Sequence, residues 1–332
     1  MAGEPQNFLL STQEESVSQP VGMGCTIIIP VYCAEENLVE LHARLTTVLR
    51  KLAFAYEILF VEDGGEDGSW DIILKLAQQD THVRGLRHAR NYGQHNALLT
   101  GIRAARGDVI VTMDDDLQHP PEYIPALLSK LEEGFDVVYG TPDREQHELW
   151  RNLASQWIKL MMQMSLGIPI ARQISALRAF RTHLRDAFAN YNSSYVSIDV
   201  LLTWGTTRFA AVPIPFAKRT RGKSGYTFRR LLAHTFNMLT GFSTLPLRLA
   251  SLLGFGFMIF GLAVLLYVLG RFLLEGTTVA GFPFLASIIA IFGGVQLFAL
   301  GILGEYLARV FIRTMGKPAA VVRDRVGFSK ET

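Results

Sequence analysis

Short apolar runs alternate with longer mixed segments between Cys25 and about Gly140. The runs that have the length and continuity of strands buried on both faces are CTIIIPVY, YEILFVED, DVIVTMDDD and DVVYG, with a shorter one at Val83–Leu86. The intervening segments are predicted as helices: Leu38–Leu52, Ser69–Gln79, Asn96–Ala105 and Pro121–Glu133. This alternation predicts an α/β domain with a Rossmann-like, mostly parallel sheet covered by helices.

The segment that follows has a less regular pattern. Residues 147–190 are expected to be helical with an interruption near Gly167, and Thr207–Pro215 is predicted as a strand. A basic loop, KRTRGKSG, comes next. On Tyr226–Thr240 the apolar residues share one side, which we interpret as an amphipathic helix lying in a membrane interface; a helix packed in a soluble core is the alternative.

Two long uncharged stretches lie near the C-terminal end. No charged residue occurs from Leu249 to Gly270 or from Gly276 to Gly304. Because about 20 apolar residues span a bilayer core, each stretch predicts a transmembrane helix, and together they predict a hairpin. Basic residues flank the hairpin on its outer ends: Arg248 before it and Arg309, Arg313, Lys317, Arg323 and Arg325 after it. The positive-inside rule therefore predicts that the α/β domain and both termini are cytoplasmic.

Composition narrows the class of protein. Hydrophobic residues make up 49% and charged residues 19% of the 332 residues, whereas a soluble domain carries about a quarter charged. An ordinary cytosolic globule and a disordered chain are excluded, and two cysteines, Cys25 and Cys33, are too few for a disulfide scaffold. In the cytoplasm we expect both to be free thiols. The net charge of +2 leaves no wide basic field, so nucleic acid is not an expected partner.

The most informative polar cluster is MDDDLQHPPE, residues 113–122. Asp114, Asp115 and Asp116 close a predicted apolar strand. In parallel sheets the ligand site lies beyond the carboxyl ends of the strands. Three adjacent carboxylates repel one another unless a cation is present, and oxygen ligands suit Mg²⁺ or Mn²⁺ together with substrate phosphates. A solvated acidic turn is the alternative.

Two further strand ends carry polar residues. Asp63 in VEDG ends the second strand and is a candidate for hydrogen bonds to a base or ribose, the alternative being a turn residue before two glycines. In RNYGQHNAL, Arg90 is a candidate phosphate contact and Gly93 permits close backbone approach. His95 is interpreted as a residue at a helix start. No CxxC, HExxH or Walker-type loop is present in the sequence, so a metal-bound nucleotide diphosphate is favoured over hydride transfer.

Five motifs in order carry a resemblance to a known family: IIIPVY, VEDG, RNYGQ, MDDDLQHPPE and GGVQLFALGILGEYLARV. Over about residues 24–325 the chain resembles the family-2 glycosyltransferases that act on polyprenyl phosphates. These include dolichyl-phosphate mannose synthase, the bactoprenol glucosyltransferases and the undecaprenyl-phosphate aminoarabinose transferases. The resemblance implies a GT-A nucleotide-sugar-binding domain, a divalent metal and inverting transfer.

The resemblance also implies roles for individual residues. The metal-binding positions are Asp114, Asp116 and Gln118, and the nucleotide-contacting positions are Pro30, Tyr32, Glu35 and Asp63, to which we add Arg90 and Asp115. Arg178 in LRAFR matches an arginine expected near the transferred phosphate. The expected contacts of the acceptor phosphate are Lys218, Arg219, Arg221 and Lys223, with Arg144 as a further candidate. The expected catalytic residues are Asp116 and Arg178, with Asp199 as a further candidate.

The chain departs from the family pattern at several positions. Cys33-Ala34 stands where many members have Asn-Glu, Gly65 replaces a common Ser, and Asp115 replaces the usual Ala of DAD. The acid that many members carry just upstream of LRAFR is absent from residues 171–176. Asp199 is a candidate substitute acid, with a position on a helix surface as the alternative. A base is optional, because a phosphomonoester with a second pKa of about 6 is mostly dianionic at neutral pH.

We therefore expect five segments in the chain. These are a disordered tail (1–22), a GT-A domain (23–225), a juxtamembrane amphipathic helix (226–246), two transmembrane helices within 247–308 (about 249–270 and 281–304) and a basic cytoplasmic tail (309–332).

The expected activity is transfer of one sugar from a nucleotide sugar to undecaprenyl phosphate at the inner (plasma) membrane. UDP is the first choice of nucleotide and GDP the alternative. Glycines such as Gly254, Gly256, Gly293, Gly294 and Gly301 allow close helix packing and, with the resemblance, suggest a homo-oligomer such as a tetramer. The alternatives are a processive polysaccharide synthase, whose Gln-x-x-Arg-Trp element is absent from the sequence, and an inactive nucleotide-binding membrane scaffold.

Overall fold

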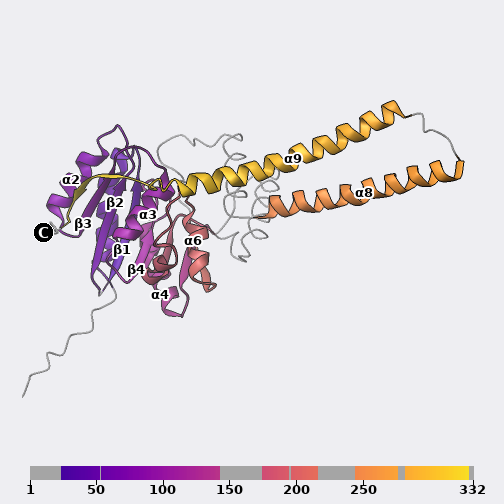
Figure 1. Cartoon of the computed structure of the whole chain (residues 1–332). Helices are drawn as coiled ribbons and strands as arrows, with labels where there is room; N and C mark the ends of the chain where they lie inside the picture. The colour runs from indigo at the N-terminus through magenta and orange to yellow at the C-terminus, as the bar shows by residue number, and fades with distance from the viewer. Residues whose placement is uncertain are drawn as a thin grey trace, which may run out of the picture.

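The computed structural model of the chain describes residues 24–52, 54–142, 174–193, 196–215, 244–275 and 281–328. An eight-stranded sheet with helices on both faces forms one end of the molecule, and two long helices extend from it as a hairpin (Figure 1). Three predictions lie outside the described residues. They are the tail over 1–22, the helix break near Gly167 and, apart from its last three residues, the amphipathic helix over 226–246.

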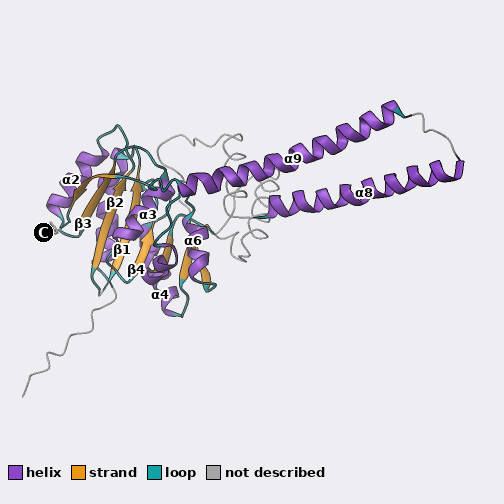
Figure 2. Ribbon diagram, viewed as in Figure 1, coloured by secondary structure: helices purple, strands orange, loops and turns teal. Residues whose placement is uncertain are grey.

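The sheet is mixed, and its centre is parallel. Its strands are β1 (Cys25–Val31), β2 (Tyr56–Glu62), β3 (Val83–His88), β4 (Val109–Thr112), β5 (Val137–Pro142), β6 (Arg178–Arg181), β7 (Phe209–Ile214) and β8 (Val322–Val326). They lie in the order β7-β5-β6-β4-β1-β2-β3-β8. Strands β3, β2, β1 and β4, which lie side by side in Figure 2, run parallel. Strands β5 and β7 are also parallel, whereas β6 and β8 are antiparallel to their neighbours. The predicted α/β sheet is confirmed.

Helices cover both faces of this sheet. They are α1 (Glu35–Leu49), α2 (Ser69–Gln79), α3 (Gln94–Ala104), η1 (Pro121–Tyr123) with α4 (Ile124–Glu132), η3 (Thr182–Phe188) and α6 (Ile198–Gly205). Side chains of α1, α2 and α4 pack on one face with Ile27 and Ile29 of β1. Those of α3, η3 and α6 pack on the other face with Ile28. Successive strand residues thus enter two separate cores, which is why β1 is apolar at nearly every position.

The helical prediction over 147–190 is wrong at its C-terminal end. Arg178–Arg181 form β6, which is inserted between β4 and β5. Arg178, Ala179 and Phe180 are buried on both faces, so tertiary pairing outweighs the local helical pattern.

A strand that the sequence analysis did not anticipate completes the sheet. Residues 322–326, expected only as part of a basic tail, form β8 and pair antiparallel with β3. Figure 1 shows this yellow segment returning from the hairpin to the far edge of the sheet. Because β8 covers β3, the ladder groups of that strand are paired rather than left at an open edge.

The hairpin consists of α8 (Leu245–Glu275) and α9 (Phe282–Thr314). Two spans within it, Pro246–Leu274 and Ile291–Thr314, are long and apolar enough to cross a membrane. Phe257 and Phe292 meet edge to face, with ring centroids 6.1 Å apart, and Phe292 packs against Gly261. By contrast, among the residues that the structure describes, no atom outside the local helix lies within 4 Å of a Cβ built on any of the five glycines named above. Within this described part of the chain, their small size therefore serves no packing.

Candidate active site

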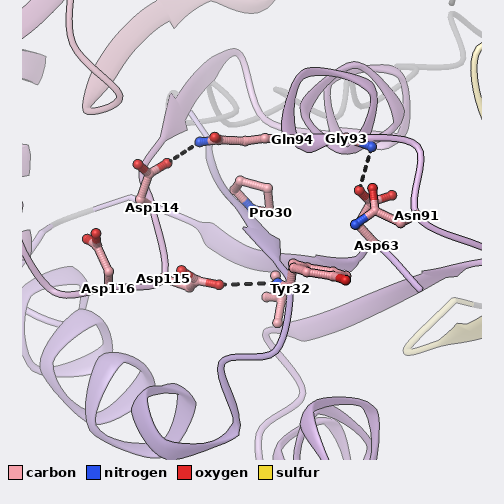
Figure 3. Close-up of a pocket in the computed structure, with 10 residues that line it drawn as sticks. Pro30, Tyr32, Asp63, Asn91, Gly93, Gln94, Asp114, Asp115 and Asp116 are labelled. Carbon is pink, nitrogen blue, oxygen red and sulfur yellow. Dashed lines mark hydrogen bonds between the residues drawn. The ribbon is translucent and has the colours of Figure 1, made fainter. Parts of the chain in front are cut away.

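A cavity opens where the central parallel strands end. It is lined by residues at or after the ends of β1, β2, β3 and β4: Pro30, Val31, Tyr32, Asp63, Asn91, Gly93, Gln94, Asp114, Asp115 and Asp116 (Figure 3). Polar groups from four separate strand ends converge because parallel strands bring their carboxyl ends to the same edge. This is the position at which a ligand site was predicted.

Asp63 organises the wall of the cavity formed by the loop after β3. Its carboxylate accepts hydrogen bonds from the backbone N–H of Tyr92 at 2.9 Å and of Gly93 at 2.7 Å. The same carboxylate lies 2.7 Å from Nδ1 of the buried His88. Gly93 has φ +96°, a conformation that side chains disfavour, and α3 begins directly after it. Asp63 thereby fixes the loop that leads into α3.

The opposite wall is acidic. Asp114 accepts a hydrogen bond from Nε2 of Gln94 at 2.5 Å, and Asp116 accepts one from the backbone N–H of Gln118 at 3.1 Å. Asp115 accepts from the backbone N–H of Tyr32 at 3.3 Å. Burial, reinforced by the charges of Asp114 and Asp116, raises the pKa of Asp115 to about 7. The cluster therefore concentrates negative charge that a cation would offset.

The donor set fits a hard divalent cation. All of the groups at this wall are carboxylate oxygens, which Mg²⁺ and Mn²⁺ prefer. Within the described part of the chain, no three Asp, Glu, His or Cys side chains form a ready-made metal cluster. A cation held by Asp114 and Asp116 would therefore take its remaining ligands from water or from a bound diphosphate, as Mg²⁺ does in many nucleotide sites.

Comparison with known proteins gives the family. The model described as Glycosyl transferase family 2 matches residues 26–188. Undecaprenyl-phosphate 4-deoxy-4-formamido-L-arabinose transferase of Salmonella choleraesuis is 37% identical over 301 residues, which cover 90% of this chain and 92% of that relative. The transferase of the same name from Salmonella typhimurium matches with the same identity and coverage. The chain belongs to glycosyl transferase family 2. It is thus a glycosyltransferase, and its mostly parallel sheet with a C-terminal hairpin is the predicted GT-A arrangement.

Solved structures resemble part of the chain more distantly. Mannosyl-3-phosphoglycerate synthase from Rubrobacter xylanophilus is 15% identical, with a TM-score of 0.48 over 66% of this chain and 72% of that one. Glucosyl-3-phosphoglycerate synthase from Mycobacterium tuberculosis, crystallised with Mn²⁺ and UDP-glucose, is 14% identical, with a TM-score of 0.48 over 66% of this chain and 77% of that one.

The glycosyltransferase cavity contains six of the residues predicted from the sequence. They come from three strand ends: Pro30, Tyr32, Asp63, Asp114, Asp115 and Asp116. Asp63 uses its carboxylate within the protein, on His88 and on the loop backbone. These contacts also fix the shape of one wall of the cavity that Asp63 lines.

Three other predicted residues lie beside the cavity rather than in its lining. The Glu35 carboxylate accepts a hydrogen bond from Gly68 N at 2.7 Å and so joins the starts of α1 and α2. The Arg90 guanidinium lies 4.4 Å from the ring centroid of Tyr92. Gln118 follows Leu117, whose φ of +60° turns the chain away after Asp116.

Arg178 and Asp199 form a buried pair behind the acidic wall. Arg178 donates from Nε to Oγ1 of Thr112 at 3.0 Å and from one terminal nitrogen to Asp199. Tyr139 donates its hydroxyl to the same Asp199 oxygen at 3.0 Å. Burial, together with Asp199, raises the pKa of Tyr139 well above its usual value, so the phenol stays protonated. Asp199 is 8% exposed, which excludes the helix-surface alternative.

Residues that the sequence analysis did not single out complete the site. Gln94 reaches Asp114, and His88 holds Asp63, although both stand within or beside the RNYGQ motif. Polar residues at a strand end and at the first position of a helix were the available signal. His95 lies in the first turn of α3, as predicted. The proposed phosphate contacts Arg144, Lys218, Arg219, Arg221 and Lys223 lie outside the described residues.

Proposed function

We propose that this enzyme transfers one sugar from a nucleotide sugar to undecaprenyl phosphate, with UDP as the first choice of nucleotide. The observation that carries the proposal is the relative of Salmonella choleraesuis, whose name specifies undecaprenyl phosphate. Its 37% identity extends over 90% of this chain, so it includes the hairpin as well as the cavity. A lipid acceptor suits a domain whose chain continues into two membrane-capable helices.

The acidic wall would hold the donor. Asp114 and Asp116 would bind Mg²⁺ or Mn²⁺, and the metal would supply charge neutralisation for the leaving diphosphate. Tyr32 and Pro30 line the side toward β1 and would contact the nucleotide, while Asp63 holds the Gly93 loop in place. A fixed set of charged groups of this kind stabilises developing charge without reorganisation during the reaction.

The acceptor needs positioning more than activation. Its phosphate is a dianion at neutral pH and already nucleophilic. Lys218, Arg219, Arg221, Lys223 and Arg144 remain our proposed contacts for it. Arg178 is better suited to positioning, because its guanidinium is bound by Asp199 and Thr112 and is 3% exposed.

Because the proposed acceptor is a membrane lipid, we also propose a location and an orientation for the enzyme. We place both termini and the catalytic domain on the cytoplasmic side of the inner membrane, where nucleotide sugars are available. The open faces of the five hairpin glycines support a homo-oligomer, with a tetramer as the first choice. Light scattering of the detergent-solubilised protein measures that state directly, and a monomeric mass contradicts it.

A product assay tests the proposal. The purified full chain in lipid nanodiscs is incubated with a panel of UDP- and GDP-linked sugars, with and without undecaprenyl phosphate. We expect a lipid carrying a single sugar, formed only when a divalent cation and the acceptor are present. A growing polymer would instead identify a processive synthase, and nucleotide binding without any product would identify a scaffold.

A further inference from the structure

The pairing between β8 and β3 ends next to the loop that forms one wall of the cavity. Gly85 pairs with Val326 in the first part of the β3–β8 ladder, and His88 pairs with Val322 after a register shift. The next residue, Ala89, donates its backbone N–H to the carbonyl of Val321 at 2.9 Å. The loop that begins there carries Asn91, Gly93 and Gln94 to the cavity. The C-terminal segment therefore forms backbone hydrogen bonds with the chain directly before the loop that makes one wall of the site.

Side chains of the C-terminal segment also pack closely against β3. The Arg84 guanidinium lies 3.8 Å from the ring centroid of Phe328, which follows β8. A Cβ on Gly85 would lie 2.8 Å from Cγ1 of Val326 and 2.6 Å from Cγ2 of Ile73, so these side chains fill the space over that glycine. Ala319, in the link between α9 and β8, is 5% exposed. The segment thus fits the edge of the sheet as closely as a core strand.

His88 transmits the position of β3 to the loop. Its backbone is opposite β8, and its buried ring lies 2.7 Å from Asp63 and 3.0 Å from Oγ1 of Thr100 in α3. Asp63 in turn accepts the Tyr92 and Gly93 N–H groups. A shift of β3 therefore moves the ring, and the ring holds the carboxylate that shapes the wall.

We propose that β8 is a positioning element for the donor cavity. It ties the end of α9 to β3 and, through His88 and Asp63, sets the conformation of residues 91–94. The inference rests on the proposed function only in taking the cavity as the nucleotide-diphosphate site. Movement of the membrane hairpin and the affinity for the donor are then coupled through one short strand. A strand that merely covers an edge would stabilise the sheet without affecting the loop.

The test weakens β8 in the full-length protein without deleting it. Val326→Ala and Phe328→Ala each remove packing against β3, whereas Arg323→Ala, on the exposed side of the same strand, is the matched control. Amide hydrogen exchange is followed at Tyr92 and Gly93, and UDP binding is measured in the presence of Mn²⁺. If weakening leaves the loop competent about a tenth of the time, exchange quickens and UDP binds about tenfold more weakly.

Steady-state kinetics separates positioning from general damage. We expect KM for the nucleotide sugar to rise in Val326→Ala and Phe328→Ala, with kcat and the KM for the lipid unchanged. His88→Ala should reproduce this pattern, and His88→Asn, which keeps a donor toward Asp63, should restore most of the affinity.

Unchanged exchange at Tyr92 and Gly93 in both folded β8 variants would overturn the proposal. If the wild type binds neither UDP nor GDP, the proposed function fails, but the exchange measurement still decides the role of β8. If Phe328→Ala does not fold, Val326→Thr keeps the shape of the side chain and gives the same readout.

Discussion

The three consecutive aspartates of the acidic wall, Asp114, Asp115 and Asp116, each have a different hydrogen-bond partner. Asp114 is held by a side-chain amide, Asp116 by the backbone of its own turn, and Asp115 by the backbone of Tyr32, directly after β1. The outer two carboxylates are therefore suited to a metal, and the middle one joins two strand ends. The Asp at position 115, where the family usually has Ala, thus has a structural contact with Tyr32.

Asp116→Asn tests the metal assignment. The substitution removes a charged ligand and keeps the volume, so we expect sugar transfer to fall at least about a hundredfold in saturating Mn²⁺. Asp115→Asn is the matched control, because an amide oxygen still accepts the Tyr32 N–H. Near-normal transfer by Asp116→Asn, or an equal loss in both variants, contradicts the assignment.

The two cysteines should differ in reactivity. Burial raises the pKa of the Cys25 thiol to about 12, whereas Cys33 is exposed at the end of the β1–α1 turn. Because the thiolate is the reactive form, a maleimide at pH 8 should label Cys33 alone, and Cys33→Ser should abolish labelling.

The same reaction reports the topology. An impermeant maleimide should reach Cys33 in inverted vesicles and fail to do so in intact cells. Labelling of intact cells would place the catalytic domain on the outer side of the membrane, contrary to the proposal.

At the scale of elements, β5, β6 and α6 are joined by the network around Asp199. Asp199→Asn leaves the buried Arg178 without its charged partner, which costs about 3–5 kcal/mol in comparable buried pairs. Tyr139→Phe removes one hydrogen bond and should cost about 1 kcal/mol. Chemical denaturation followed by tryptophan fluorescence measures both. A smaller loss of unfolding free energy for Asp199→Asn than for Tyr139→Phe would show that the Arg178–Asp199 ion pair does not stabilise the protein as proposed.

The sequence predicted the elements whose pattern is local. Helix α2 has the predicted bounds Ser69–Gln79, and β1, β2 and β5 differ from the prediction by a few terminal residues. Strand β6 was assigned to a helix because its four residues, RAFR, are too few to show a periodicity of their own. Strand β8 was missed because three of its five residues are charged, and its partner β3 lies more than 200 residues earlier.

The site residues also divide into those that a local pattern predicted and those that depend on the folded chain. Aspartates at strand ends were found because parallel topology brings such ends together. The contacts of His88 with Asp63 and of Gln94 with Asp114 depend on side-chain directions in folded loops, which no spacing rule specifies. Conversely, Arg178 matched a motif, yet its burial behind Thr112 depends on the placement of β6.

At the scale of the whole molecule, the hairpin can be separated from the sheet only if β8 is kept. We expect a protein in which a glycine-serine linker replaces residues 245–314 to bind UDP with Mn²⁺, because the link and β8 remain. It should lose most transfer to undecaprenyl phosphate in bilayers, since it no longer stays at the membrane. Binding and bilayer transfer assays measure the two effects.

A simple truncation provides the contrast. Deleting residues 247–332 also removes β8, so the β3 edge is exposed and the protein should aggregate or bind UDP more weakly than the linker variant. Equal behaviour of the two proteins would show that β8 contributes nothing to the isolated domain. Full transfer by the linker variant in bilayers would contradict the role given to the hairpin.

The late position of β8 in the chain also sets an order of events during synthesis. A ribosome releases the chain from its N-terminus, so β1 to β7 leave the exit tunnel before either long helix, and β8 leaves after both. Domains generally begin folding as they emerge, but here the ladder partner of β3 arrives only after α8 and α9 have been translated. The nascent enzyme therefore carries an open sheet edge until both long helices have been translated. The β3 edge beside the cavity is thus completed only after both long helices have been synthesised.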